Sequence, residues 1–161
     1  MVNVHVAYTQ PINPAGASPI LTESQVWEGL ERKVRFAQEF VGAIESTDVL
    51  EEKDEGKTVV RIAHFKPEFI AEKGAAKETC RLYKPTKVDF VRDNGAVITN
   101  TVSYGESLGE TDLWMTYTFE YRDIEESKVV EMRKLYRDGA KGAVDSSIKS
   151  IREMVKDGRI K

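Results

Sequence analysis

Apolar and small residues recur every three or four positions over residues 125–157, which predicts a long C-terminal helix with one apolar face. The residues on that face are Val129, Met132, Tyr136, Ala140, Ala143, Ser147, Ile151 and Met154. Charged residues such as Lys141, Asp145 and Lys149 lie on the opposite side, and Gly158 is placed for a left-handed helix end. At a rise of about 1.5 Å per residue the helix is about 45 Å long, and it needs an apolar surface to pack on.

The segments before this helix alternate between apolar and polar residues or are rich in β-branched residues, which predicts strands. The predicted strands cover residues 2–8, 49–52, 58–65, 75–83, 87–92, 96–104 and 111–121. Most of them are joined by short turns, such as Asp93-Asn94-Gly95, and residues 67–74 form a longer connection. Hairpin-length connections indicate an antiparallel sheet.

Two short helices are predicted after the first strand and the proline-containing loop at residues 10–20. Residues 22–25 (TESQ) form a capping box, which opens a helix whose stripe is Trp27, Leu30 and Val34. The apolar spacing from Phe36 to Ile44 predicts the second short helix. The sequence therefore predicts an α+β helix-grip fold. In that fold a curved sheet of about seven strands grips the C-terminal helix, here within one domain spanning residues 1–161.

Four small residues fall within five positions of the long helix, at Gly139, Ala140, Gly142 and Ala143. Glycine inside a helix costs about 1 kcal/mol relative to alanine, so the cluster calls for an explanation. Small side chains on the inner face would leave an enclosed apolar cavity between helix and sheet. Close packing of helix on sheet, or a kink, is the alternative explanation.

Composition excludes several classes of function. The net charge of −3 argues against a nucleic-acid or anionic-membrane surface, and no apolar run is long enough to span a bilayer. Two histidines and one cysteine disfavour a metal site, and no cofactor-binding fingerprint occurs. No signal peptide is visible at residues 1–6, and the single cysteine fits a reducing compartment, so we expect a cytoplasmic protein without cofactors.

Glu78 is the candidate for a buried charge, because it alternates with apolar residues on the inner face of its strand. A buried carboxylate needs a partner, and the preceding strand offers Arg61 or His64 according to the register. Arg61 is favoured, since a guanidinium can bind a carboxylate with two N–H groups. The His64 alternative would form an acid–base pair suited to proton transfer, and an exposed ion pair is the third reading.

Further candidates for a ligand-binding cavity share inward faces of the strands and the long helix. Asn100 lies on an otherwise apolar strand face and could bind a ligand carbonyl, or it could satisfy backbone groups at a bulge. The other candidates could line an aromatic-rich pocket or simply pack the core, and they are Met115, Tyr117, Phe119, Tyr136, Ala140 and Ala143.

Several segments resemble a known family. Residues 21–30 (LTESQVWEGL), 113–120 (LWMTYTFE) and 151–160 (IREMVKDGRI) are similar to the opening, the last strand and the ending of the AtaL-like (DUF1857) proteins. Arg61, Glu78 and Asn100 also match, and the resemblance runs from about residue 3 to residue 160. The family lies within the START/Bet v 1-like (SRPBCC) superfamily. The resemblance implies a cavity for a hydrophobic ligand and, through some relatives, a link to fungal secondary metabolism.

Two hypotheses for function remain open from the sequence. In the first, the protein binds a small hydrophobic or aromatic metabolite between the sheet and the C-terminal helix. In the second, the same cavity is the active site of a cofactor-free cyclase, dehydratase or isomerase. There Glu78, aided by Arg61 or His64, would move a proton.

Overall fold

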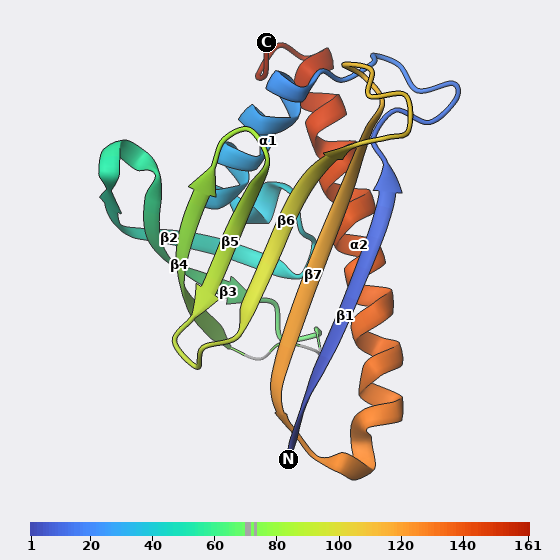
Figure 1. The fold of residues 1–161 in the computed structure, drawn as a ribbon. Helices are drawn as coiled ribbons and strands as arrows, with labels where there is room; N and C mark the ends of the chain where they lie inside the picture. Colours follow the sequence, from blue (N-terminus) through green and yellow to red (C-terminus); the bar gives the residue numbers. More distant parts are fainter. Residues whose placement is uncertain (70–71, 73) are drawn as a thin grey trace.

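The computed structural model describes residues 1–69, 72 and 74–161, and its centre is a seven-stranded antiparallel sheet (Figure 1). The strands are β1 (Val2–Pro11), β2 (Ile44–Lys53), β3 (Thr58–Phe65), β4 (Ala75–Tyr83), β5 (Lys87–Arg92), β6 (Val97–Tyr104) and β7 (Leu113–Ile124). Their order across the sheet is β1-β7-β6-β5-β4-β3-β2, so the first strand pairs with the last. Residues 70, 71 and 73 of the predicted connection lie outside the described residues.

Two helices lie on the same face of this sheet, which confirms the helix-grip prediction (Figure 1). Helix α1 spans Glu23–Arg35, and α2 spans Val129–Lys156. The capping box is formed as predicted, because Thr22 Oγ1 accepts the Gln25 N–H and Gln25 Oε1 accepts the Thr22 N–H. Within the part of the chain that the structure describes, no helix is long and apolar enough to cross a membrane.

The apolar face predicted for α2 is buried. The buried residues of the helix are Tyr136, Ala140, Ala143, Val144, Ser147, Ile148, Ile151 and Met154. They contact mainly β1 and β7, while the charged side faces solvent. Gly158 has a φ of 84°, the left-handed conformation expected just after the helix. The helix itself begins at Val129, preceded by the 3-10 turn η3 (Glu126–Lys128).

The second short helix, predicted from Phe36 to Ile44, is wrong in extent. Phe36 leaves helical geometry with φ −132° and ψ 55°, and a single 3-10 turn follows, η1 (Ala37–Glu39). The Ala37 N–H is donated to Thr47 Oγ1 of β2 at 3.2 Å, so this backbone group is satisfied from the sheet rather than along a helix. The apolar spacing instead places Phe40 in the core.

Strand β2 starts earlier than the predicted segment 49–52, at Ile44, and it forms one edge of the sheet. Of its ten residues Ile44 alone is buried. Its pairing with β3 is interrupted between Ile44 and Ser46 and again between Val49 and Glu51. An exposed edge strand with two irregularities lacks the apolar alternation by which strands are recognised in a sequence.

The apolar interior is divided between two main clusters. The larger one joins α1, the sheet and the C-terminal half of α2, around Trp27, Leu30, Tyr117 and Ile151. A smaller one lies under the N-terminal half of α2, and its buried members are Val4, Val6, Tyr136 and Ala140. Partly buried Tyr8 and Phe119 contact both clusters.

Gly139 and Gly142 do not create a void against the sheet, so that part of the cavity argument is wrong. Both glycines lie on the exposed side of α2, and a Cβ added at either would meet nothing within 4 Å. Ala140 and Ala143 are the small residues that face inward, and each belongs to an apolar cluster. The reason is helical geometry, since residues 139 and 142 fall outside the inward stripe that Tyr136, Ala140 and Ala143 form, and both are exposed.

At Gly29, the packing of α1 against α2 leaves no room for a side chain. A Cβ at this position of α1 would lie 2.5 Å from Ile151 Cγ1 and 2.7 Å from Ile151 Cδ1 of α2. We expect Gly29→Ala to reduce the free energy of unfolding by about 1–3 kcal/mol, because Ile151 is fully buried and β-branched. Gly142→Ala is the control, and in an exposed helix position it should add up to about 1 kcal/mol. Urea denaturation measures both, and equal effects would contradict the close contact.

Candidate functional site

A buried ion pair joins β3 and β4 below helix α1. Of the two possible registers, the structure has the one that places Arg61 opposite Glu78. Arg61 Nε and Nη2 both donate to Glu78 Oε2, at 2.9 and 2.8 Å, and the two residues are 3% and 2% exposed. Both side chains lie on the inner face of the sheet, as alternation along the strands predicts.

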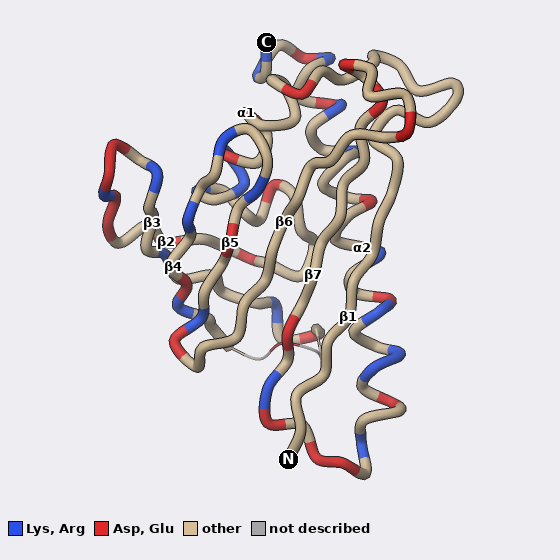
Figure 2. The backbone as a smooth tube through the Cα atoms, viewed as in Figure 1, with Lys and Arg blue, Asp and Glu red and all other residues tan. Residues whose placement is uncertain are grey.

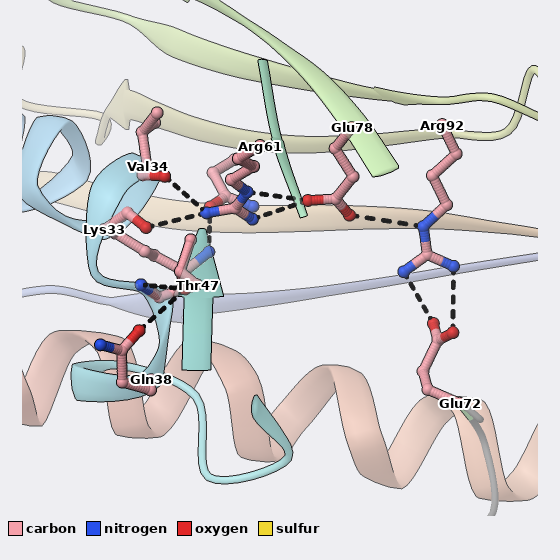
Figure 3. A network of polar contacts seen from close by, with 10 residues as sticks. Lys33, Val34, Gln38, Thr47, Arg61, Glu72, Glu78 and Arg92 are labelled. Carbon is pink, nitrogen blue, oxygen red and sulfur yellow. Dashed lines mark hydrogen bonds and ion pairs between the residues drawn. The ribbon is translucent and has the colours of Figure 1, made fainter. Parts of the chain in front are cut away.

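Arg61 also binds the end of helix α1 (Figure 3). Its Nη1 donates to the carbonyl oxygens of Lys33 and Val34, at 3.0 and 2.9 Å. Carbonyls in the last turn of a helix lack intrahelical donors and carry the negative end of the helix dipole, so a buried guanidinium is a favourable partner. One side chain therefore connects α1, β3 and β4.

The ion pair continues along the sheet through a second arginine (Figure 3). Arg92 Nε lies 3.4 Å from Glu78 Oε1, and Arg92 Nη2 lies 2.9 Å from Glu72 Oε1. Burial alone would raise the pKa of Glu78, but the attraction of Arg61 and Arg92 outweighs it and holds that pKa below its ordinary value. Glu78 is thus a carboxylate bound on both oxygens, an arrangement that suits anchoring better than proton transfer.

Lys33 of α1 is the buried ionisable residue that the sequence reasoning missed. Its Nζ donates to Asn100 Oδ1 of β6 at 2.6 Å. The same nitrogen lies 5.0 Å from the ring centroid of Phe90 and 4.6 Å from that of Tyr117. Burial, followed by repulsion from Arg61, lowers the pKa of Lys33 to about 7. An amine with this pKa exchanges its proton readily near neutrality.

Three buried polar atoms, on the Lys33 neighbours Asn100 and Tyr117 and on Ser147 beside Tyr117, have no hydrogen-bond partner among the described residues. They are Asn100 Nδ2, the Tyr117 hydroxyl and Ser147 Oγ of α2. Asn100 and Tyr117 are direct cross-strand partners on β6 and β7. Burial raises the pKa of Tyr117, and Ser147 is close enough to oppose that rise, although the two hydroxyls do not meet the geometry of a hydrogen bond. We call Lys33, Asn100, Tyr117 and Ser147 the polar cluster.

His64 does not belong to this site, so the proposed His64–Glu78 pair is wrong. Its register partner on β4 is Ala75, and its side chain lies on the opposite face of β3 from Arg61. His64 Nε2 is 2.8 Å from Asp48 Oδ2 of β2, in a pair that is largely exposed. Cys80 is buried, and burial raises the pKa of its thiol to about 12, so the thiol stays protonated.

The remaining candidate residues divide between the two apolar clusters. Met115 and Ala143 belong to the larger cluster, together with Tyr117. Met115 lies two positions before Tyr117 on β7, and Ala143 lies four positions before Ser147 on α2. Tyr136 and Ala140 belong to the smaller one, where the Tyr136 ring stacks on Tyr121 at a centroid distance of 3.6 Å. Phe119 is only partly buried and contacts both. The structure therefore brings together part of the predicted ligand-binding set.

A sequence signal for Lys33 did exist. Lys33 lies three positions after Leu30 and seven after Val26, on the apolar face of α1. Ser147 likewise interrupts the apolar face of α2, and both interruptions mark polar groups turned inward. Arg92 carries a comparable signal, because it follows the buried Val88 and Phe90 on the inner face of β5. Glu72 carries none, since the connection between β3 and β4 in which it lies has no periodicity in the sequence.

Two hollows on the surface lie away from the polar cluster. One is lined by outer-face residues of β1, β6 and β7, including His5, Thr99 and Thr118. The other lies between the loop after β1 and the C-terminal part of α2, near Ala15 and Arg152. Neither of these two hollows contains a residue of the polar cluster. Asn100, Tyr117 and Ser147 are at most 1% exposed, so a ligand would reach them only if the side chains around them moved.

Comparison with solved structures places the fold among START-like proteins. The aromatase/cyclase Zhui from Streptomyces sp. R1128 matches with a TM-score of 0.65 and 14% identity, over 96% of this chain and 94% of that one. One half of the di-domain aromatase/cyclase BexL, from the BE-7585A biosynthetic pathway, matches with a TM-score of 0.67. It is 8% identical, over 94% of this chain and 50% of BexL. A START superfamily protein from Mycobacterium smegmatis matches with a TM-score of 0.63 and 9% identity, over 95% and 97% of the two chains.

Sequence comparison gives the family. A search of curated proteins finds no significant match. The family model described as "Acetylaranotin biosynthesis cluster protein L" matches residues 6–158, nearly the whole chain. This match shows that the chain belongs to the AtaL family, and its fold is START-like.

Proposed function

We propose that this protein binds a small, largely apolar or aromatic metabolite between the sheet and α2, with the polar end of the ligand at the polar cluster. The proposal rests on one observation, the three buried polar atoms without partners at Asn100, Tyr117 and Ser147. A buried polar group that lacks a hydrogen bond costs about 1–3 kcal/mol. Three of them beside one buried amine are more readily explained by a ligand than by packing.

The surroundings of the polar cluster supply the rest of such a site. Apolar and aromatic side chains, among them Phe90, Met115 and Ile148, belong to the cluster of core residues around it. A ligand site of this class needs mostly apolar walls and a few fixed polar groups. The family takes its description from a biosynthesis cluster protein, and Zhui and BexL are aromatase/cyclases, so we place the ligand in secondary metabolism. The single cysteine, Cys80, fits a reducing compartment, so we place the protein in the cytoplasm.

A cofactor-free cyclase, dehydratase or isomerase on the same site is the second candidate. The observation that favours it is Lys33, whose pKa of about 7 suits an amine that accepts and returns a proton. In this version Lys33 replaces Glu78 as the proton carrier, because both oxygens of Glu78 are bound by arginines. Arg61 and Glu78 then keep the end of α1, and with it Lys33, in place.

The ligand can be identified by native mass spectrometry of the protein purified from its own host. Turnover of that ligand by the wild-type protein, lost in a Lys33→Met variant that still binds it, would support the enzyme. Binding without any change in the ligand would support the binding protein.

Removing either the Tyr117 or the Ser147 hydroxyl should affect stability and ligand binding in opposite directions. We expect Tyr117→Phe and Ser147→Ala to leave the ligand-free protein as stable or up to about 1 kcal/mol more stable, because each removes an unpaired buried hydroxyl. The same variants should weaken binding of the identified ligand, or of the probe 2-naphthol, about tenfold. Calorimetry and urea denaturation measure the two quantities.

Thr118→Val is the matched control, since Thr118 is exposed on the other face of β7 and should not affect binding. If the hydroxyl variants destabilise the free protein and bind as the wild type does, the hydroxyls serve the fold alone. Absence of any bound molecule, combined with no binding of 2-naphthol, would overturn the proposed function.

A further inference from the structure

We infer that the polar end of the ligand is an acidic oxygen, such as an enol, a phenol or a carboxylic acid, held as an anion by Lys33 and Asn100. This inference rests on the proposed function and narrows it to a class of ligand. It is carried by the charges around the site and by the kind of hydrogen-bonding atoms that are left free.

The buried charges around α1 do not balance. Two buried cations, Lys33 and Arg61, face one buried carboxylate, Glu78. The partly buried Arg92 and Glu72 pair with each other and leave this excess of one positive charge unchanged. Both carboxylates are bound by arginines, and among the residues that the structure describes none forms an ion pair with Lys33. An isolated buried charge is strongly unfavourable, so an anionic group at Lys33 would complete the set.

The polar atoms of the cluster that lack a partner can donate hydrogen bonds, so they suit a ligand group that accepts them. Asn100 Oδ1 already accepts from Lys33, which leaves the Asn100 amide N–H groups and the remaining ammonium N–H groups as donors. The hydroxyls of Tyr117 and Ser147 can donate as well. Donors around one cation match an oxygen that carries negative charge. A hydrocarbon would leave these donors unpaired, and a neutral ether oxygen would accept their hydrogen bonds without compensating the ammonium charge.

The aromatic rings beside Lys33 explain how the free protein tolerates the site. Phe90 and Tyr117 present their faces to Nζ at 5.0 and 4.6 Å, which partly stabilises the ammonium. They do not replace an anion, as the lowered pKa of Lys33 shows. Near pH 7 the free site therefore holds a lysine that is protonated only in part, and an anionic ligand would stabilise its charged form.

The test compares two probes of the same shape and different charge, 2-naphthoate and 2-naphthamide, by calorimetry just below pH 7. We expect the wild-type protein to bind the carboxylate at least about tenfold more tightly than the amide. Lys33→Met should lose that preference and bind the amide within about threefold of the wild type. Lys141→Met is the matched control, because Lys141 is an exposed lysine of α2 paired with Asp145, and it should keep the preference.

Equal affinity of the wild type for the two probes would overturn the acidic-ligand inference and leave the proposed function standing. Failure to bind either probe, with no ligand found by native mass spectrometry, would overturn both. The comparison of probes on the wild type needs no variant, so it remains decisive if Lys33→Met does not fold. Lys33→Gln then provides the second uncharged variant.

Discussion

Arg61→Ala is expected to lower the free energy of unfolding by about 3–5 kcal/mol, the largest effect of any single substitution considered. The variant leaves the buried Glu78 carboxylate with Arg92 alone, at 3.4 Å. It also removes the donor for the Lys33 and Val34 carbonyls at the end of α1. Urea denaturation followed by circular dichroism measures the loss.

The double variant Arg61→Ala/Glu78→Gln separates the charge from the packing. It should be more stable than Arg61→Ala, because no buried carboxylate remains short of its partner. Arg35→Ala is the control, since Arg35 pairs with Glu52 at a largely exposed position and such pairs contribute at most about 1 kcal/mol. Equal stability of the single and double variants would contradict a buried, ionised Glu78.

The second large effect is expected in the pH dependence of stability. Lys33 has a pKa of about 7 in the folded protein, against an ordinary value of 10.5 for the unfolded chain. Between these values the unfolded chain binds more protons, so raising the pH favours folding. Relative to Lys33→Met, the wild type should gain up to about 1.4 kcal/mol per pH unit from pH 7 towards pH 10.

Denaturation of both proteins at several pH values measures this gain, and the difference between them cancels titrations that they share. The groups that face Lys33 are Arg61 of β3, Glu78 and Cys80 of β4, and Tyr117 of β7. Lys57→Met gives a matched control, because Lys57 is an exposed lysine between η2 (Asp54–Gly56) and β3. A difference between wild type and Lys33→Met that does not change with pH would show that Lys33 titrates normally.

Much of the fold follows from period and alternation alone. The inward stripe of α2 and the inward faces of β4, β6 and β7 are where the pattern predicts them, since burial is what produces the pattern. Alternation also placed Glu78 and Asn100 inside. It could not decide between Arg61 and His64, because the register of β3 on β4 depends on how the chain crosses between them.

The errors share a physical cause. The spacing of apolar residues shows which side of an element is apolar, but it does not show where the backbone hydrogen bonds go. The second predicted helix is reduced to η1, because the Ala37 N–H donates to Thr47 of β2. The small residues at Gly139 and Gly142 suggested a void, but both positions lie on the exposed part of the α2 surface. Lys33 was missed because a lysine on an apolar helix face usually buries only its aliphatic stem and keeps its charged end in water. Here the whole side chain is buried.

The irregular pairing of β2 has a consequence for how copies of the protein meet one another. An edge strand offers free backbone N–H and C=O groups to any other strand, and regular exposed edges promote aggregation. Here two breaks in the pairing with β3 disturb the regular ladder. Acidic residues are also dense along β2 and the turn after it, as Figure 2 shows, among them Glu51, Glu52 and Asp54. Like charges and an irregular edge would make pairing between the β2 strands of two copies unfavourable. The sheet is therefore protected from aggregation at its β2 edge.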